Sequence, residues 1–337
     1  MKFSTLFPPH RKDAVEAALL AAFGTTVIDN VTTLAGGLSS AHTYQLTVDG
    51  QMYVLKLSPP NLSATNLLLA ADANIAPTLH YQDTLTGITI SDYIESQPVR
   101  AVFTPDKLIS EIAAIVKAIH LIPSGVDGAP LFETVDSLIS QFKQKKILSG
   151  PVFDECFVNY AILKSRIVLT DSDRVFSHND LNPNNILCDG KRMWIIDWDA
   201  AHLNDRYIDL ANLANFFVHT DEQEQMFLSA YFDGDVNEYK KARFFTMRQV
   251  CRIVYSMLMF QLAAQHKPTN YEHDQKMEGI DLQLFFGLMG KGEISLANYD
   301  GQLMYGKALL NTAVNQMRSV RWATSLAQFA QQPVTDK

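Results

Sequence analysis

The sequence predicts an α+β fold, with a small antiparallel sheet near the N-terminus and a larger, mainly helical portion after it. Short runs with strand-like alternation, joined by glycine-containing turns, fill residues 1–95. From residue 96 onward, apolar residues recur at the three- and four-residue spacing of helices. The chain has 337 residues, of which 47% are hydrophobic, so two parts with substantial cores are expected. We place them at residues 1–95 and 96–331, with 332–337 as a tail.

The N-terminal part is predicted to contain one helix followed by a five-stranded sheet. A helix rich in Ala and Leu is predicted over residues 13–22, and Gly24 ends it. The dipeptide Asp49-Gly50 between two alternating runs predicts a tight hairpin turn, because such turns need positive φ. A short helix is predicted over residues 66–73. The strands are predicted at residues 27–34, 44–48, 52–57, 79–81 and 87–90.

The larger portion is predicted to be helical. Its first helix begins at the capping pair Thr104-Pro105 and runs to about His120 with apolar residues on one face. An irregular segment is expected from Gly290 to Gly301. The other helices are predicted at residues 135–148, 153–169, 208–219, 222–232, 237–266 and 303–331.

One stretch, residues 177–199, indicates a chemical function. Two apolar, strand-favouring runs flank Asp189-Gly190, which predicts a β-hairpin with a loop of either two or four residues. With either loop, the hairpin brings Asp197 back beside Asn185. Both side chains offer the oxygen ligands that Mg²⁺ prefers. Asp180 lies just before them on a loop, where a carboxylate can accept a proton from a substrate hydroxyl.

The pattern His178-x-Asp180-x₄-Asn185, followed by Ile196-Asp197, resembles motifs of the protein-kinase-like small-molecule phosphotransferases. It is most similar to those of the choline/ethanolamine kinases and aminoglycoside phosphotransferases. The resemblance implies a protein-kinase-like two-lobed fold, with ATP and Mg²⁺ as cofactors. It assigns Asp180 as the catalytic base, and Asn185 and Asp197 as the catalytic residues that hold Mg²⁺. His178 is expected to support the catalytic loop.

The resemblance also assigns nucleotide-binding roles. Lys56 matches the strand lysine that kinases place on the α- and β-phosphates. Backbone groups of Asp92, Tyr93 and Ile94 are expected to pair with adenine, as the hinge of the family does. A glycine turn with adjacent hydroxyl groups is expected to approach the phosphates. Its residues are Gly36, Gly37, Ser39 and Ser40.

One departure from the family concerns the partner of Lys56. The family supplies a glutamate from the following helix to hold this lysine, but residues 61–71 contain no acid. We therefore expect Lys56 to be oriented by hydroxyl or amide groups, or by an acid elsewhere in the chain.

The phosphate acceptor implied by the resemblance is a small alcohol. A cationic acceptor is expected, because the net charge of −8 suits a cation. Its ammonium group would bind to aromatic faces and carboxylates. An aminoglycoside kinase, a thiamine kinase and a nucleotide-binding pseudokinase that serves as an interaction module are the alternatives. The candidate acceptor-binding residues are Asp199, Asp205, Tyr255 and Trp322.

Composition argues against several other classes. The acidic net charge disfavours nucleic acids and anionic membranes as partners. No apolar run reaches transmembrane length, and the first residues do not form a secretory signal. The three cysteines, Cys156, Cys188 and Cys251, are widely spaced and odd in number. They predict reduced thiols in a cytoplasmic protein.

Overall fold

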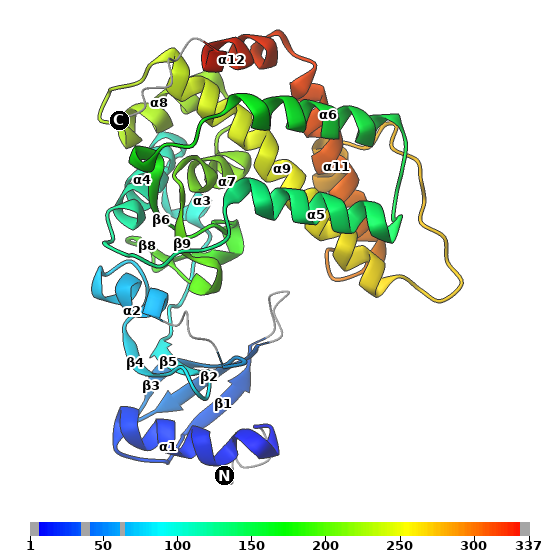
Figure 1. Ribbon diagram of the computed structural model, residues 1–337. Helices are drawn as coiled ribbons and strands as arrows, with labels where there is room; N and C mark the ends of the chain where they lie inside the picture. The colour runs from blue at the N-terminus through cyan, green and yellow to red at the C-terminus, as the bar shows by residue number, and fades with distance from the viewer. Residues whose placement is uncertain (1–6, 35–40, 61–64, 331–337) are drawn as a thin grey trace. The chain divides into compact units, whose positions relative to one another are not determined.

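A computed structural model describes residues 7–34, 41–60 and 65–330 of the chain (Figure 1). The chain forms two compact units. Unit 1 contains residues 1–126 and 176–203, and unit 2 contains residues 127–175 and 204–337. The predicted α+β class is confirmed, because unit 1 holds a five-stranded sheet and unit 2 is built mainly from helices. The boundary predicted from the sequence, at residue 95, does not coincide with the limits of these units. It stays a prediction.

The five-stranded sheet of unit 1 is antiparallel throughout and has the order β1-β2-β3-β5-β4. Asp49 and Gly50 join β2 to β3 with φ angles of 49° and 74°, the positive values that the predicted hairpin turn needs. Helix α1 (Lys12–Phe23) packs against the sheet, and buried residues of both, such as Leu19 and Leu46, form one core (Figure 1). The strands are β1 (Asn30–Thr33), β2 (His42–Val48), β3 (Gln51–Leu57), β4 (Leu79–Asp83) and β5 (Ile88–Asp92).

Helices and a hairpin complete unit 1. Helix α1 ends at Gly24, whose φ of 70° is the left-handed value expected of a glycine that follows a helix. The helices are η2 (Pro9–Arg11), α1 (Lys12–Phe23), α2 (Thr65–Asp72), α3 (Val99–Val102) and α4 (Pro105–His120). The hairpin segment contains η5 (Pro183–Asn185), β7 (Ile186–Cys188), β8 (Met193–Ile195) and η6 (Trp198–Ala200).

The chain passes between the units three times: between residues 126 and 127, and within two strands that pair with each other, β6 (Arg174–Ser177) and β9 (His202–Asp205). Neither strand is predicted from the sequence, because each has only four residues and lacks a clear alternation of apolar and polar side chains. A short 3₁₀ helix, η4 (Asp171–Asp173), precedes β6.

Unit 2 is organised around the long helix α9, which lies beside α11 (Figure 1). The two helices approach closely at Gly306, whose carbonyl accepts a 2.7 Å hydrogen bond from Ser256 Oγ. The helices are α5 (Leu131–Lys145), α6 (Pro151–Arg166), α7 (Tyr207–Phe217), α8 (Asp221–Tyr231), α9 (Glu238–His266), α10 (Leu282–Gly290), α11 (Tyr299–Met317) and α12 (Val320–Ala330).

Two predictions for the C-terminal helices are wrong. Residues 303–331 do not form one helix, because the chain breaks between α11 and α12, where Ser319 Oγ accepts a hydrogen bond from the Trp322 N–H at 3.2 Å. Helix α10 is absent from the prediction. Its N-cap is Asp281, whose Oδ1 accepts a 2.7 Å hydrogen bond from the Leu284 N–H.

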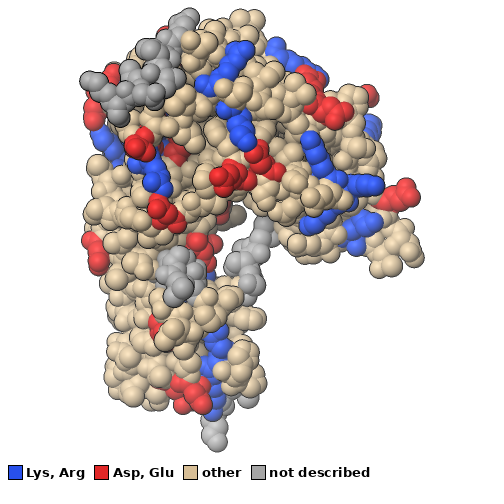
Figure 2. Space-filling view, viewed as in Figure 1, with Lys and Arg blue, Asp and Glu red and all other residues tan. Residues whose placement is uncertain are grey.

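Figure 2 shows basic and acidic side chains interspersed on the visible face of the described residues. Across residues 7–34, 41–60 and 65–330, no helix combines the length and the apolar character that crossing a membrane requires. All three cysteines are free and buried, as the prediction of reduced thiols requires.

Candidate active site

The hairpin of unit 1 brings the predicted catalytic residues together. Strands β7 and β8 pair with Ile186 opposite Ile195, and the turn between them spans the four residues 189–192. The Asp189 carboxylate fixes this turn, because Oδ1 accepts hydrogen bonds from the backbone N–H groups of residues 191 and 192, both at 2.9 Å. Beyond the strands, the Ile196 N–H donates to the Asn185 carbonyl at 3.0 Å. Asp197 therefore follows directly beside Asn185, as predicted.

The carboxylate of Asp180 is held by two side-chain amides. Asn182 Nδ2 donates to Oδ1 and Asn185 Nδ2 donates to Oδ2, each at 3.1 Å. Asn185 Nδ2 also donates to the Asp180 backbone carbonyl at 2.9 Å. These bonds fix the orientation of a half-buried carboxylate. The carboxylate is therefore oriented before a substrate arrives, and a carboxylate held in this way is suited to accept a proton from a hydroxyl group.

Asn185 and Asp197 fit the donor set that Mg²⁺ requires. The Asn185 amide nitrogen is used in bonds to Asp180, which leaves the amide oxygen as an acceptor. Asp197 supplies a carboxylate and has a φ of 65°, a left-handed value that is uncommon for residues other than glycine. Two protein oxygens suffice for Mg²⁺ bound together with phosphates, because this ion keeps several waters. Within the described ranges, no larger cluster of His, Cys, Asp and Glu suited to a metal ion is found.

His178 is fully buried and connects the catalytic loop to the end of the hairpin. Its Nδ1 accepts a hydrogen bond from the Asp180 N–H at 3.3 Å, so Nε2 carries the proton and donates to the Ile196 carbonyl at 3.0 Å. The ring also packs edge-on against Trp198, with 4.7 Å between the centroids. These are the contacts of a residue that supports the loop.

Lys56 contacts two carboxylates of the segment after the hairpin. Its Nζ lies 2.6 Å from Asp197 Oδ1 and 3.0 Å from Asp199 Oδ2. Burial, the largest single contribution, lowers the pKa of Lys56, but the charges and hydrogen bonds of Asp197 and Asp199 outweigh it. The pKa is therefore raised, and the lysine stays a cation at neutral pH. An acid elsewhere in the chain thus takes the place of the missing helix glutamate.

Helix α2, where the family carries that glutamate, is attached to the same segment by an amide. Asn66 is fully buried, and its Nδ2 donates to the Ala201 carbonyl at 2.6 Å. The helix and the carboxylate-bearing segment are therefore connected directly, while the lysine is held separately by Asp197 and Asp199.

The predicted hinge residues begin at Asp92, the last residue of β5, and part of their backbone already forms hydrogen bonds. The Asp92 N–H donates to the Thr78 carbonyl at 2.9 Å, and the Tyr93 N–H donates to the Met52 carbonyl at 3.2 Å. Adenine can therefore pair only with carbonyl groups of this segment or with N–H groups from Ile94 onward. The other predicted phosphate-binding residues lie outside the described residues; they are Gly36, Gly37, Ser39 and Ser40.

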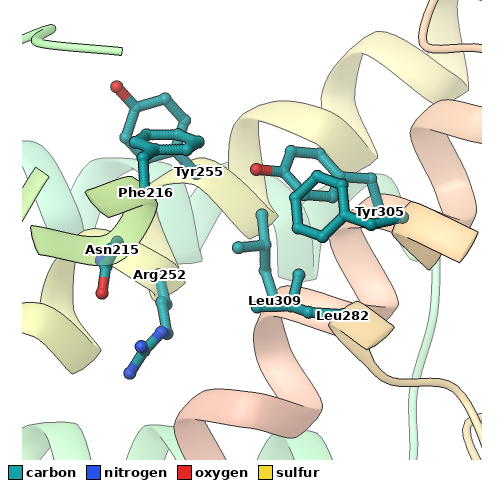
Figure 3. Close-up of a pocket in the computed structure, with 8 residues that line it drawn as sticks. Asn215, Phe216, Arg252, Tyr255, Leu282, Tyr305 and Leu309 are labelled. Atoms are coloured by element: carbon teal, nitrogen blue, oxygen red, sulfur yellow. The ribbon is translucent and has the colours of Figure 1, made fainter. Parts of the chain in front are cut away.

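The four candidate acceptor residues are divided between the two units. Asp199 is in unit 1, where it contacts Lys56. In unit 2, Asp205 is buried against the Arg243 guanidinium, and Trp322 is buried in α12. Tyr255 lines a pocket of unit 2 that neither Asp205 nor Trp322 lines (Figure 3).

Sequence reasoning missed two residues of interest. The first is Asn182, whose place two residues after Asp180 could have suggested a contact with that carboxylate. Arg252, which lines the same pocket as Tyr255, has no local sequence signal, because arginines are common on helices.

Comparisons with known proteins identify a family and related folds. The sequence profile described as the phosphotransferase enzyme family matches residues 30–245. The LicA protein of Haemophilus influenzae is 34% identical over 67 residues, which are 20% of this chain and 25% of that protein. The chain thus matches only about a quarter of the length of that relative.

Solved structures extend the likeness to most of the chain. The crystal structure of a choline/ethanolamine kinase family protein from Mesorhizobium loti has a TM-score of 0.66 at 19% identity, covering 95% of this chain and 99% of that chain. A spectinomycin phosphotransferase in complex with ADP and spectinomycin has a TM-score of 0.55 at 16% identity, covering 88% and 98%. These likenesses confirm the predicted kinase-like fold.

Proposed function

The chain belongs to the phosphotransferase enzyme family, and from that premise we propose that it moves the γ-phosphate of MgATP to a hydroxyl group of a small molecule. The observation that carries this proposal is the Asp180 carboxylate, held by two amides beside the Asn185 and Asp197 pair. Lys56, which contacts Asp197, belongs to the same group. All four residues lie in unit 1.

Asp180 is the general base in this proposal. Its two oxygens are oriented by the amides of Asn182 and Asn185, so the carboxylate is fixed before an acceptor arrives. It binds the acceptor hydroxyl and takes its proton as the oxygen attacks the phosphorus. Because transfer is direct, most of the rate gain comes from positioning and electrostatics, without a covalent enzyme intermediate.

The nucleotide would be held by residues of unit 1. Lys56 binds the α- and β-phosphates, and the carbonyl groups of residues 92–94 with the Ile94 N–H pair with adenine. Asn185 and Asp197 would hold Mg²⁺, which when bound neutralises charge on the phosphates. The turn with Gly36, Gly37, Ser39 and Ser40 is proposed to approach the same phosphates.

Replacement of Asp180 tests the proposal. We expect Asp180→Asn to lower kcat by roughly 100- to 10,000-fold, because the amide cannot accept the proton. Binding of a non-hydrolysable ATP analogue, measured by calorimetry, should be unchanged. Asp72→Asn is the matched control, since Asp72 is an exposed carboxylate at the end of α2. An Asp180→Asn enzyme that turns over like the control would contradict the assignment.

We propose a small cationic alcohol as the first acceptor to test. The net charge of −8 and the exposed carboxylate of Asp199, with 59% of its side chain accessible, support this choice. A coupled ADP-release assay with choline, ethanolamine, thiamine and kanamycin separates the choline-kinase-like reading from the thiamine and aminoglycoside alternatives. Rapid turnover with a neutral or anionic alcohol, and none with these four, would overturn the cationic assignment.

The alternative of another class is a nucleotide-binding pseudokinase. The absence of an acid in residues 61–71 favours it, but Asp197 and Asp199 supply Lys56 with carboxylate partners. ATP binding without turnover for any acceptor, together with no effect of Asp180→Asn, is the result that would favour the pseudokinase.

A further inference from the structure

Unit 2 contains a small pocket lined by helices α7, α9, α10 and α11 (Figure 3). About 20 Å³ of it is available to the centre of a water-sized sphere, and the pocket is partly open to solvent. Since roughly 10–15 Å³ of such space holds one water, the pocket accepts only ligands about as small as water. Its polar lining residues are Asn215, Arg252, Tyr255 and Tyr305.

Arg252 brings a positive charge to this pocket, and the residue is only 8% exposed. Its Nη1 donates to the neutral amide oxygen of Gln249 at 2.5 Å, while its Nε is buried without a hydrogen-bond partner among the described residues. The remaining nitrogen, Nη2, donates to no group in the part of the chain that the structure describes. Burial, followed by the charge of Arg248, lowers the pKa of Arg252 to about 9, so the group is still a cation at neutral pH.

The charges around Arg252 do not balance it. Arg248 lies one turn earlier on α9, and it shares the Glu224 carboxylate with Arg321. Asn215 is also engaged with Arg248: its Oδ1 accepts from Nε at 3.2 Å, and its Nδ2 donates to the carbonyl at 3.1 Å. A buried cation without an anion beside it is unfavourable, which points to an anion supplied from outside the chain.

Tyr305 supplies a second donor in the same pocket. Its ring stacks on Phe285 with 4.7 Å between the centroids, and the residue is buried. Burial raises the pKa of Tyr305 to about 12, although the nearby charge of Arg252 opposes the shift, so the hydroxyl keeps its proton at neutral pH. Within the described ranges, this hydroxyl makes no hydrogen bond to the chain. It can therefore donate to a ligand beside Arg252.

We propose that this pocket is a binding site for a small monovalent anion such as chloride, held by the Arg252 guanidinium and the Tyr305 hydroxyl. Chloride is close to water in size, so it fits a space that excludes anions with an organic body. A bound water would satisfy the donors but leave the positive charge unbalanced, and a cation would meet a like charge. The inference concerns unit 2 alone, goes beyond the proposed phosphotransfer and does not depend on it.

Thermal unfolding of the full-length chain tests for the site. Chloride is titrated against gluconate, which is too large for the pocket, at constant ionic strength and pH. We expect the Tm to rise with chloride and then saturate, with a total gain of at least about 2 °C, because an ion that binds only the folded chain stabilises it. A Tm that does not change, falls, or changes without saturating marks a general salt effect and overturns the proposal.

Two substitutions test the residues. Arg252→Gln should abolish the saturable gain, whereas Arg318→Gln, which removes the same charge at an exposed residue outside the pocket, should keep it. Tyr305→Phe should raise the half-saturating chloride concentration at least roughly fivefold, as expected for loss of a hydrogen bond to a charged group. Tyr271→Phe, at a half-exposed tyrosine that does not line the pocket, should leave it unchanged. A gain retained in Arg252→Gln, or equal effects of a substitution and its control, contradicts the assignment.

Bromide provides a direct measurement on the wild-type chain, which decides the question if Arg252→Gln does not fold. It has the charge of chloride and scatters X-rays anomalously. Crystals soaked in bromide should show an anomalous peak within hydrogen-bond distance of Arg252 Nη2 and the Tyr305 hydroxyl. Peaks confined to the protein surface would indicate an adventitious ion only and would overturn the proposal.

Discussion

At the scale of single residues, the orientation of Lys56 depends on the carboxylates of Asp197 and Asp199. Asp197 makes the shorter contact and also belongs to the proposed metal pair. Asp199 is largely exposed, and in the proposed reaction it touches neither the phosphates nor the acceptor hydroxyl. Toward the nucleotide, Asp199 is therefore a positioning residue, which acts through the lysine.

Asp199→Asn should weaken nucleotide use through Lys56. We expect the KM for ATP to rise by roughly two- to fivefold, because exposed ion pairs contribute little to binding. The value of kcat should change less, since Asp180, Asn185 and Asp197 are untouched. Steady-state kinetics over a range of ATP concentrations measures both parameters.

A double-mutant cycle provides the control for this prediction. In a Lys56→Met background the lysine is absent, so adding Asp199→Asn should not raise the KM further. An equal increase in both backgrounds would mean that Asp199 acts directly on the nucleotide or the metal. Asp199→Glu should restore most of the loss, because it keeps the charge.

The sequence predicts local relations between site residues well and distant ones poorly. Asp180, Asn185 and Asp197 lie within one hairpin segment, so strand and turn signals were enough to bring them together. The partners of Lys56 lie 141 and 143 residues further along the chain. No local pattern joins residues so far apart, and for this reason the choice between an amide, a hydroxyl and a distant acid stayed open.

At the scale of elements, the contact between α9 and α11 depends on one small residue. A Cβ atom on Gly306 would lie 2.7 Å from Phe260 Cε1. The Phe260 ring is fully buried and packs against Phe142 and Phe153, with centroid distances of 5.3 and 5.9 Å. Because these rings hold it on the other side, it cannot move aside without disturbing the core.

Gly306→Ala should therefore destabilise the chain. We expect a loss of about 1–3 kcal/mol in the free energy of unfolding, since overpacking outweighs the gain in helix propensity. Gly287→Ala in α10 is the matched control, because a Cβ there meets no atom within 4 Å. It should be neutral, or stabilise by up to about 1 kcal/mol. Urea titrations followed by circular dichroism compare the two; equal effects would show that the helix contact is looser than described.

Elements with strong boundary signals were predictable, and those without were not. Both the turn at Asp49-Gly50 and the hairpin at Asp189-Gly190 contain a glycine that adopts positive φ readily. In the hairpin, the Asp189 side chain also accepts backbone hydrogen bonds of the turn. The break between α11 and α12 was missed because helix-compatible residues continue across it. Ser319, whose hydroxyl caps α12, is the residue from which the start of a new helix could have been predicted.

At the scale of the whole molecule, buried thiols report on both units. Cys188 lies in unit 1, and Cys156 and Cys251 lie in unit 2. Burial, assisted by the nearby Glu155 charge, raises the pKa of Cys156 to about 12, and burial raises the pKa of Cys251 further. Neither thiol forms its reactive thiolate at neutral pH while the chain is folded.

We therefore expect the native protein to react with a thiol reagent only as it unfolds. An unfolded cysteine has a pKa of about 8.5, so each thiol becomes reactive when its surroundings open. Addition of Mg²⁺ with an ATP analogue should slow labelling of Cys188, because ligand binding stabilises the folded form of unit 1. Mass spectrometry of digested protein identifies each labelled residue. Rapid labelling of all three cysteines in native buffer would contradict their burial. If the Mg²⁺ and ATP analogue slowed labelling of Cys156 and Cys251 but not of Cys188, the result would contradict nucleotide binding in unit 1.

The division of the chain into compact units follows a different criterion from the predicted boundary at residue 95, which stays a prediction. The sequence indicated a change from strands to helices near residue 95, but unit 1 continues to residue 126 and resumes at 176. Helix α4 has its buried apolar residues on one face, as helix α5 of unit 2 does, so its pattern does not assign it to either unit. Only tertiary packing assigns it to the sheet-containing unit.

The discontinuity of unit 1 has a consequence for biosynthesis. Lys56 is made 141 residues before Asp197, which at ribosomal elongation rates is a delay of roughly 7 to 28 s. Throughout that interval the nascent sheet carries its lysine without the two carboxylates that neutralise it. The proposed binding of ATP by a ribosome-bound chain therefore waits until the second segment, with Asp197, has emerged.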